Sequence, residues 1–175
     1  GRRDLRTKDN EPEINLIPSG WKITPLEHHV SFIKNGNHSR AQLTTNDPVR
    51  YLHYGDIHAS SGIFLVPEHA EMPRLPTTAA AKLPRLKPGD VVFVDASEDV
   101  DGIGKSVEVA GCDAVEVVAG LHTVAARFNE EILAHGFKGY LQFIPGFSAH
   151  LKRLAAGTKV YATNRRHIAS AEVLL

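Results

Sequence analysis

The chain has very little cysteine, with one residue, Cys112, among 175. A single cysteine excludes an internal disulfide and any zinc site built from several cysteines, and we expect Cys112 to be a buried thiol. Long hydrophobic runs are also missing, since no stretch approaches the roughly 18 apolar residues of a membrane span. The polar start, Gly1 to Arg6, does not resemble a signal sequence. These absences predict a cytoplasmic protein without membrane association.

Neither sign of charge is in excess, because 20 Lys and Arg balance 20 Asp and Glu. This balance excludes a histone-like polycation, although it permits a local basic face. A hydrophobic content of 42% and a charged content of 23% are typical of a soluble globular protein, and 175 residues suit one domain. We expect residues 1–17, which are basic and aperiodic, to form a flexible arm or linker, and residues 18–175 to form the domain.

Motifs for common enzyme chemistry are absent as well. The sequence contains no P-loop, no GxGxxG, no GxSxG and no HExxH. Gly102 to Ser106 has one residue between its glycines where a phosphate-binding loop needs four. None of the ten histidines forms a helical i, i+4 pair beside a carboxylate, so no metal site is expected. A Cys112–His122 dyad would lack a third, orienting group. We therefore expect no catalytic residue and no cofactor.

Short apolar segments separated by turns fill most of the expected domain. Val91 to Val94 is a continuous apolar run, as in a buried strand, and it follows the turn Lys87 to Asp90. The proline-rich segment 73–84 is expected to be a loop. The expected strands are 49–54, 63–66, 91–94, 106–109, 114–118, 122–125 and 159–161. Asn164 is expected to be a cap. Residues 169–175 are expected to form a last strand or the start of a connection.

The clearest helix signal covers Ser148 to Ala156. Ser148 could cap its first turn, Leu151, Leu154 and Ala155 form an apolar stripe, and Gly157 could end it. Together these segments predict an α+β fold, with a curved, mostly antiparallel β-sheet and a few short helices at one end.

Basic and amide side chains form the most suggestive polar pattern. Lys34 to Gln42 carries donors suited to phosphates and base edges, and two basic pairs follow near the end of the sequence. These side chains could supply the electrostatic part of duplex binding, or they could be scattered over a solvated surface. The candidate DNA contacts are Lys34, Arg40, Lys105, Arg127, Lys152, Arg153, Arg165 and Arg166.

The order of several short motifs resembles a known family. Pro18 to Trp21 is followed by Tyr54 to Ile57, Leu86 to Phe93, Val118 to Arg127, and Leu151 to Gly157. This series is similar to the target recognition domain of a type I restriction–modification DNA specificity (S) subunit, over residues 18–175. Gly55–Asp56, Gly89–Asp90, Leu121 to Thr123 and Trp21 are expected to shape turns and core rather than to contact DNA.

The resemblance implies a non-catalytic protein that reads half of a bipartite double-stranded DNA target. Its partners would be DNA methyltransferase (modification) subunits, which methylate adenine, and a restriction/translocase subunit. S-adenosylmethionine, ATP and Mg would be bound only by those partners. The sequence lacks the family's long spacer helix, a second copy of the motif series and the Ile-Pro-x-Pro segment. A fragment, a half-length subunit that dimerises and part of a fused enzyme therefore remain open.

Two other classes of function are compatible with the residues. A β-rich protein-interaction or small-ligand-binding domain could use the segment 73–84 for docking, and it would not bind duplex DNA. An enzyme with His122 as its base would need a pocket of perturbed groups around that histidine, which the sequence does not indicate.

Overall fold

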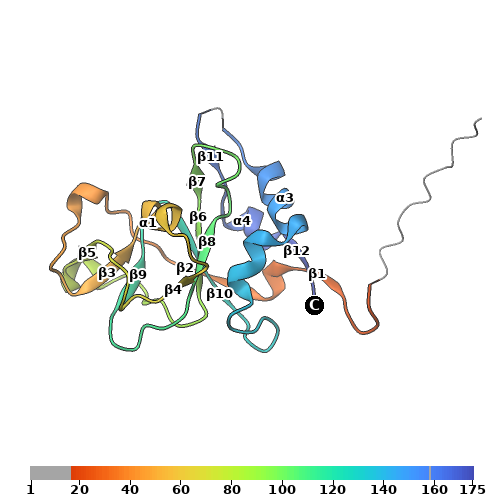
Figure 1. Ribbon diagram of the computed structural model, residues 1–175, viewed down its shortest axis with the longest axis horizontal. Helices are drawn as coiled ribbons and strands as arrows, with labels where there is room; N and C mark the ends of the chain where they lie inside the picture. The colour runs from red at the N-terminus through yellow and green to blue at the C-terminus, as the bar shows by residue number, and fades with distance from the viewer. Residues whose placement is uncertain (1–16, 158) are drawn as a thin grey trace, which may run out of the picture.

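A five-stranded sheet lies at the centre of the molecule, in the strand order β2-β10-β6-β8-β4 (Figure 1). This computed structural model describes residues 17–157 and 159–175, so all but the last residue of the arm expected over 1–17 lies outside the described residues. Neighbouring strands of the sheet are antiparallel, except that β4 runs parallel to β8. The strands are β2 (Val30–Ile33), β4 (Phe64–Leu65), β6 (Val91–Val94), β8 (Ser106–Val109) and β10 (Thr123–Phe128).

Both faces of this sheet are covered, and each face belongs to a different core. Side chains alternate between the faces along a strand. Val91 and Phe93 accordingly join one apolar cluster, whereas Val92 and Val94 join another. All four residues of β6 are buried, as the apolar run predicts. The central sheet therefore separates two cores rather than covering one.

Helices cover one face of the sheet (Figure 1). Leu141, Phe147, Leu151 and Ile168 pack with Phe93 in the first core. A two-stranded antiparallel sheet, β1 with β12, closes this side. The elements are η1 (Leu26–His28), η3 (Lys138–Phe143), α3 (Pro145–Leu154), α4 (Arg165–Ala169), β1 (Ile23–Pro25) and β12 (Glu172–Leu174).

A smaller sheet, in the order β5-β3-β9, lies on the other side together with α1. Ile57 of α1 packs against Val92 and Val94 in the second core. β3 is parallel to β9 and antiparallel to β5, and a further pair joins β7 to β11. The elements are β3 (Val49–Leu52), β5 (Arg74–Leu75), β9 (Val117–Ala119), β7 (Ala96–Ser97), β11 (Tyr161–Ala162), α1 (Tyr54–Ala59), α2 (Thr77–Ala80) and η2 (Arg40–Gln42).

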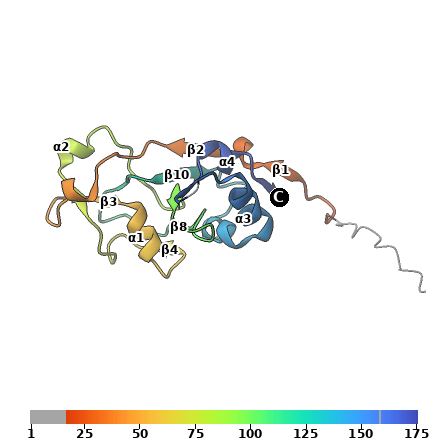
Figure 2. The ribbon, with the colours of Figure 1, turned by 90° about the horizontal axis from the view of Figure 1, so that it is seen from above.

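The predicted α+β class, with mostly antiparallel strands and a few short helices, is confirmed, and two details differ from the expectation. The single curved sheet is instead four separate sheets among the described residues. The helices do not gather at one end, because α1 and α2 lie on the side of the central sheet opposite α3 and α4 (Figures 1 and 2). The proline-rich segment 73–84, expected to be a loop, contains β5 and α2.

Several local predictions also need correction. The helix α3 begins at Pro145, whose missing N–H costs nothing in a first turn, so Ser148 lies inside the helix and does not cap it. The turn expected at Gly55–Asp56 is the start of α1. Trp21, expected in the core, is 52% exposed.

No helix within residues 17–157 and 159–175 is long and apolar enough to cross a membrane.

A buried ion pair ties the turn before β6 to β10. Asp90 is 1% exposed, and its two carboxylate oxygens accept hydrogen bonds from Arg127 Nε (2.8 Å) and NH2 (2.7 Å). The same carboxylate accepts from the backbone N–H of Lys87 at 2.7 Å. Hydrogen bonding to Asp90 raises the pKa of Arg127. Such a forked arrangement satisfies a carboxylate that would otherwise be buried without a partner.

Replacing Arg127 with Ala should therefore destabilise the fold. The expected loss is about 2–3 kcal/mol in the free energy of unfolding, less than for a fully buried pair because Arg127 reaches solvent. Urea denaturation followed by circular dichroism would measure it. Arg127→Lys keeps the charge but loses the forked pair of hydrogen bonds, so its stability should lie between that of the wild type and that of Arg127→Ala. Lys82→Ala changes an exposed side chain and serves as the control, and its unfolding free energy should change little. An unchanged midpoint for Arg127→Ala would contradict the structural role.

Candidate nucleic-acid interface

Three of the predicted DNA contacts are used inside the fold. Lys105 Nζ donates to the carbonyl oxygens of His58 (2.6 Å) and Ser60 (2.8 Å), where the last carbonyls of α1 lack helical partners. Arg127 is paired with Asp90, as described above. Lys152 Nζ lies 2.7 Å from Asp101 Oδ1, and this hydrogen bond lowers the pKa of Asp101. Their assignment as DNA contacts stays a prediction.

Arg153 is exposed but belongs to a different surface. Its guanidinium lies 3.2 Å from His150 Nδ1, beside a hollow of about 600 Å³ between α3 and β12. Apolar side chains, among them Ile144 and Leu174, form much of that hollow. Apolar surroundings do not suit a phosphate contact. Arg153 is therefore not grouped with Lys34, Arg40, Arg165 and Arg166.

The remaining four predicted residues are Lys34, Arg40, Arg165 and Arg166, and a series of contacts connects the segments that carry them. The first hollow, about 550 Å³ in volume, is lined by Asn35, Asp95, Thr163, Arg165 and Arg166 among others. Arg165 NH2 donates to the carbonyl oxygen of Ile33 at 3.2 Å and lies 3.4 Å from Asn35 Oδ1. These bonds join α4 to the end of β2 and the segment that follows it, and Figure 2 shows that segment running from β2 toward β3. Lys34, next to Asn35, is exposed.

A short helix positions the two arginines. Asn164 Oδ1 accepts hydrogen bonds from the backbone N–H groups of Arg166 (2.9 Å) and His167 (3.1 Å). This is the N-cap that the sequence predicts, since Asn favours this position strongly. The cap begins α4 at Arg165, so that both guanidinium groups belong to the first turn.

A second hollow, also about 550 Å³, adjoins the first. Tyr54, His58, Ser97 and His122 line it, and the Nδ1 of His122 lies 3.3 Å from Oδ1 of Asp95, which lines the first hollow. Burial raises the pKa of Asp95, and the neighbouring His122 opposes that rise. The sequence predicted a turn at His122, and the structure adds an exposed imidazole that faces a hollow.

Arg40 continues this series on the other side of α1. Its NH2 lies 2.9 Å from Asp56 Oδ1, in the first turn of the helix. Burial, with the nearby charge of Arg40 adding to it, lowers the pKa of His53, the residue before the helix. We call Lys34, Asn35, Arg40, His122, Arg165 and Arg166 the candidate interface.

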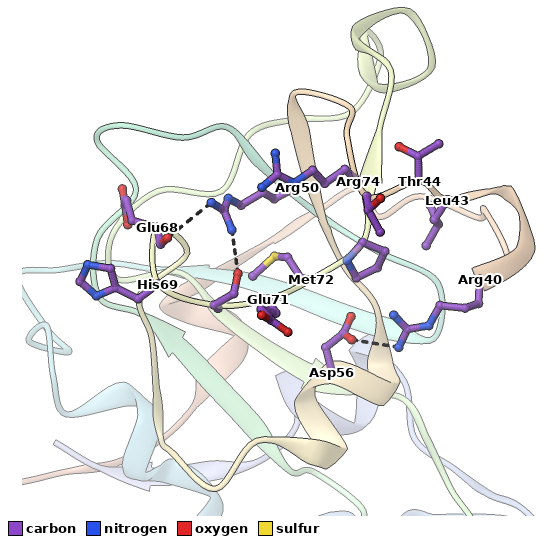
Figure 3. A pocket seen from close by; sticks show the side chains of 13 residues that line it. Arg40, Leu43, Thr44, Arg50, Asp56, Glu68, His69, Glu71, Met72 and Arg74 are labelled. Carbon is purple, nitrogen blue, oxygen red and sulfur yellow. Dashed lines mark hydrogen bonds and ion pairs between the residues drawn. The ribbon is translucent and has the colours of Figure 1, made fainter.

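Arg40 also borders a third hollow, of about 730 Å³ (Figure 3). Arg50 and Arg74 point into this region from β3 and β5, and Arg50 is held by the carbonyl oxygens of Ala70 (2.7 Å) and Glu68 (3.4 Å). Sequence reasoning missed both arginines, although Arg50 interrupts the otherwise apolar strand β3. Glu68, Glu71 and Asp56 line the same hollow, so its charge is mixed.

Metal chemistry receives no support from the arrangement of side chains. Within residues 17–157 and 159–175, no three His, Cys, Asp or Glu side chains come together as a metal site would require. Cys112 is partly buried against the carbonyl oxygen of Leu86, and burial raises the pKa of its thiol. A raised thiol pKa disfavours the reactive thiolate.

No family model matches the chain, and no curated protein matches it. Among solved structures, it is similar to the HsdS subunit from Thermoanaerobacter tengcongensis, with 14% identity, a TM-score of 0.60, and coverage of 95% of this chain and 35% of that one. An S subunit of a type I restriction–modification system from M. genitalium matches at 10% identity and a TM-score of 0.54, covering 94% of this chain and 36% of the other.

A third match comes from a structural study of complex assembly and conformational transition in the type I R-M system. Its identity is 14% and its TM-score 0.58, over 94% of this chain and 36% of the other. The chain thus has the fold of a region of type I S subunits and spans about a third of the length of these structures. The fold that the motif order suggested is confirmed.

Asn164→Ala should loosen the helix that carries Arg165 and Arg166. Loss of the cap is expected to cost about 1 kcal/mol of unfolding free energy, because two backbone N–H groups lose their acceptor. Thermal denaturation would measure the change. Asn164→Asp, which keeps a capping oxygen, is the matched control and should stay close to the wild type; equal losses for both variants would contradict the capping role.

Proposed function

We propose that this chain is a double-stranded DNA recognition domain of a type I restriction–modification specificity subunit, reading half of a bipartite target. The observation that carries the proposal is the fold, which is shared with S subunits over nearly the whole chain. The domain is proposed to be non-catalytic and cytoplasmic. Adenine methylation and DNA cleavage would be performed by modification and restriction/translocase subunits, which would bind S-adenosylmethionine, ATP and Mg.

The candidate interface supports this proposal through its division of chemical roles. Lys34 and Arg166 are exposed, and neither side chain has a polar partner among the described residues, so both are suited to holding phosphates. Arg165 is oriented by Ile33 and Asn35, and a guanidinium fixed in this way is suited to a base edge. Zero net charge is compatible with such a site, because the net charge does not say where the individual charges lie.

The decisive experiment is selection of the chain against a randomised duplex pool at low and at higher salt. Enrichment of one short motif, weakening as salt rises, is expected. Retention without enrichment would indicate electrostatic binding alone. A chain that retains no duplex at low salt would overturn the proposal and favour the protein-interaction or small-ligand alternative.

Lys34→Ala and Arg166→Ala should each weaken binding to all sequences alike. Each change removes one phosphate contact, so the slope of log affinity against log salt should fall by about 1. Fluorescence anisotropy with the selected duplex and a scrambled duplex would measure both quantities. Lys22→Ala removes an exposed lysine beside the C-terminal strand pair and is the matched control. If the control lost as much affinity as the two variants, the placement of the interface would be wrong.

A further inference from the structure

His122 has an unusual backbone conformation. Its φ is +56°, and it is the one residue other than glycine with a positive φ among the described residues. This region is uncommon for side chains with a Cβ, although His, Asn and Asp enter it more readily than most. Strained residues of this kind persist only where the surrounding structure holds them, and they concentrate at functional sites.

Asp95 holds His122 at two points. The backbone N–H of Asp95 donates to the carbonyl oxygen of His122 at 3.2 Å, and Oδ1 of Asp95 lies 3.3 Å from the imidazole Nδ1. The ring of Tyr54 packs edge-on against the imidazole, with centroids 5.3 Å apart. The side chain is thus fixed in direction while 50% of it remains exposed. Preorganisation of this kind is what a contact needs in order to discriminate between ligands.

The pair with Asp95 also assigns the two ring nitrogens. A carboxylate only accepts hydrogen bonds, so Nδ1 carries a proton and donates to Asp95. The other nitrogen, Nε2, has no polar partner among the described residues and is therefore free for a ligand. When the ring is neutral Nε2 accepts, and when the ring is protonated Nε2 donates and Asp95 balances the added charge.

The charges around His122 indicate which kind of ligand fits. Glu98 and Asp99 line the same hollow, and their carboxylates would repel a phosphate group. A G·C base pair suits the hollow better, because its major-groove edge offers guanine N7 and O6 as acceptors and the cytosine N4 amino group as a donor. The one free N–H of a protonated imidazole can donate to guanine N7 or O6, and a carboxylate can accept from the cytosine N4 amino group.

We propose that His122 is a specificity-determining residue that donates from Nε2 to the guanine of one G·C pair in the DNA target, with Asp95 as its positioning residue. This inference rests on the proposed function. It assigns base recognition to a histidine of the candidate interface, whereas the basic residues Lys34 and Arg166 hold the phosphates.

The proposed contact depends on pH, because Nε2 can donate only when both nitrogens of the ring carry a proton. Binding DNA raises the proton affinity of the donating ring, so the contact is complete at low pH and is lost as pH rises. Tyr54, His58, Glu98 and Asp99 line the same hollow as His122, and Asp95 bonds to its imidazole. Besides burial, the charges of Arg40, Asp56 and His122 all affect the pKa of His53, the residue before α1. Arg165 and Arg166 of α4 line the neighbouring hollow together with Asp95.

The test is duplex selection with the wild-type chain and with His122→Asn, each at pH 6 and pH 8. Asn tolerates a positive φ and does not titrate. We expect the wild type at pH 6 to select a motif with one G·C position that the variant no longer fixes, and affinity for the selected duplex to fall about tenfold in the variant at pH 6. At pH 8 the two proteins should differ little.

Three further variants make the result specific. His122→Gly also relieves the backbone strain and replaces the Asn variant if that protein does not fold. His135 is another half-exposed histidine, and it pairs with Glu130 at 2.7 Å. It lies beside Gly89, at the opposite end of β6 from Asp95. His135→Asn should therefore keep the wild-type dependence of DNA binding on pH. Asp95→Asn should reduce the preference for low pH while leaving the backbone in place.

Each contrary outcome has a separate meaning. If the wild type selects a motif and the His122 variants select the same one at both pH values, the His122 inference is wrong and the proposed function stands. Equal losses on every sequence would make His122 a phosphate contact and would also overturn it. A wild type that selects no motif overturns the inference, and one that retains no duplex at low salt overturns the proposed function as well.

Discussion

The central sheet is buried on both faces, and this constraint determines where any polar site can lie. β6 and β10 pair in the middle of the sheet, and alternate residues of each strand enter different cores. Neither face can therefore present cations to a ligand. Polar side chains gather where the strands end, at Asp95 after β6, at His122 before β10 and at Lys34 after β2. A binding site at strand ends is rigid, because its supports belong to the sheet.

The same constraint explains why the balanced net charge is informative only after folding. Two basic side chains bind groups within the protein. Arg127 pairs with the buried Asp90, and Lys105 donates to the terminal carbonyls of α1. Other basic groups, among them Lys34, Lys82 and Arg166, are exposed and have no polar partner among the described residues. Affinity for a polyanion depends on this remainder and not on the sum over the sequence.

Much of the fold could be predicted from the sequence, because the period of the apolar residues is local information. The run Val91 to Val94 indicated a buried strand, and Asn164 indicated the start of a helix; both signals lie within a few residues of the elements they predict. The capping of α3 was missed because Pro145 at the first helical position competes with Ser148. The separation into four sheets was missed because strand partners, such as β3 with β9, are distant in sequence.

The site was harder to predict than the fold, since residue type does not say which groups meet. Arg127 and Arg165 look alike in sequence, yet one is paired with a buried carboxylate and the other borders a hollow. His122 shows the opposite case, because nothing in its neighbours along the chain indicates a positive φ or a bond to Asp95, 27 residues away. A search of the sequence for basic residues finds side chains that attract DNA of any sequence. Discrimination between bases requires a side chain held in one direction, and that property exists only when the turn at His122 has folded onto the end of β6.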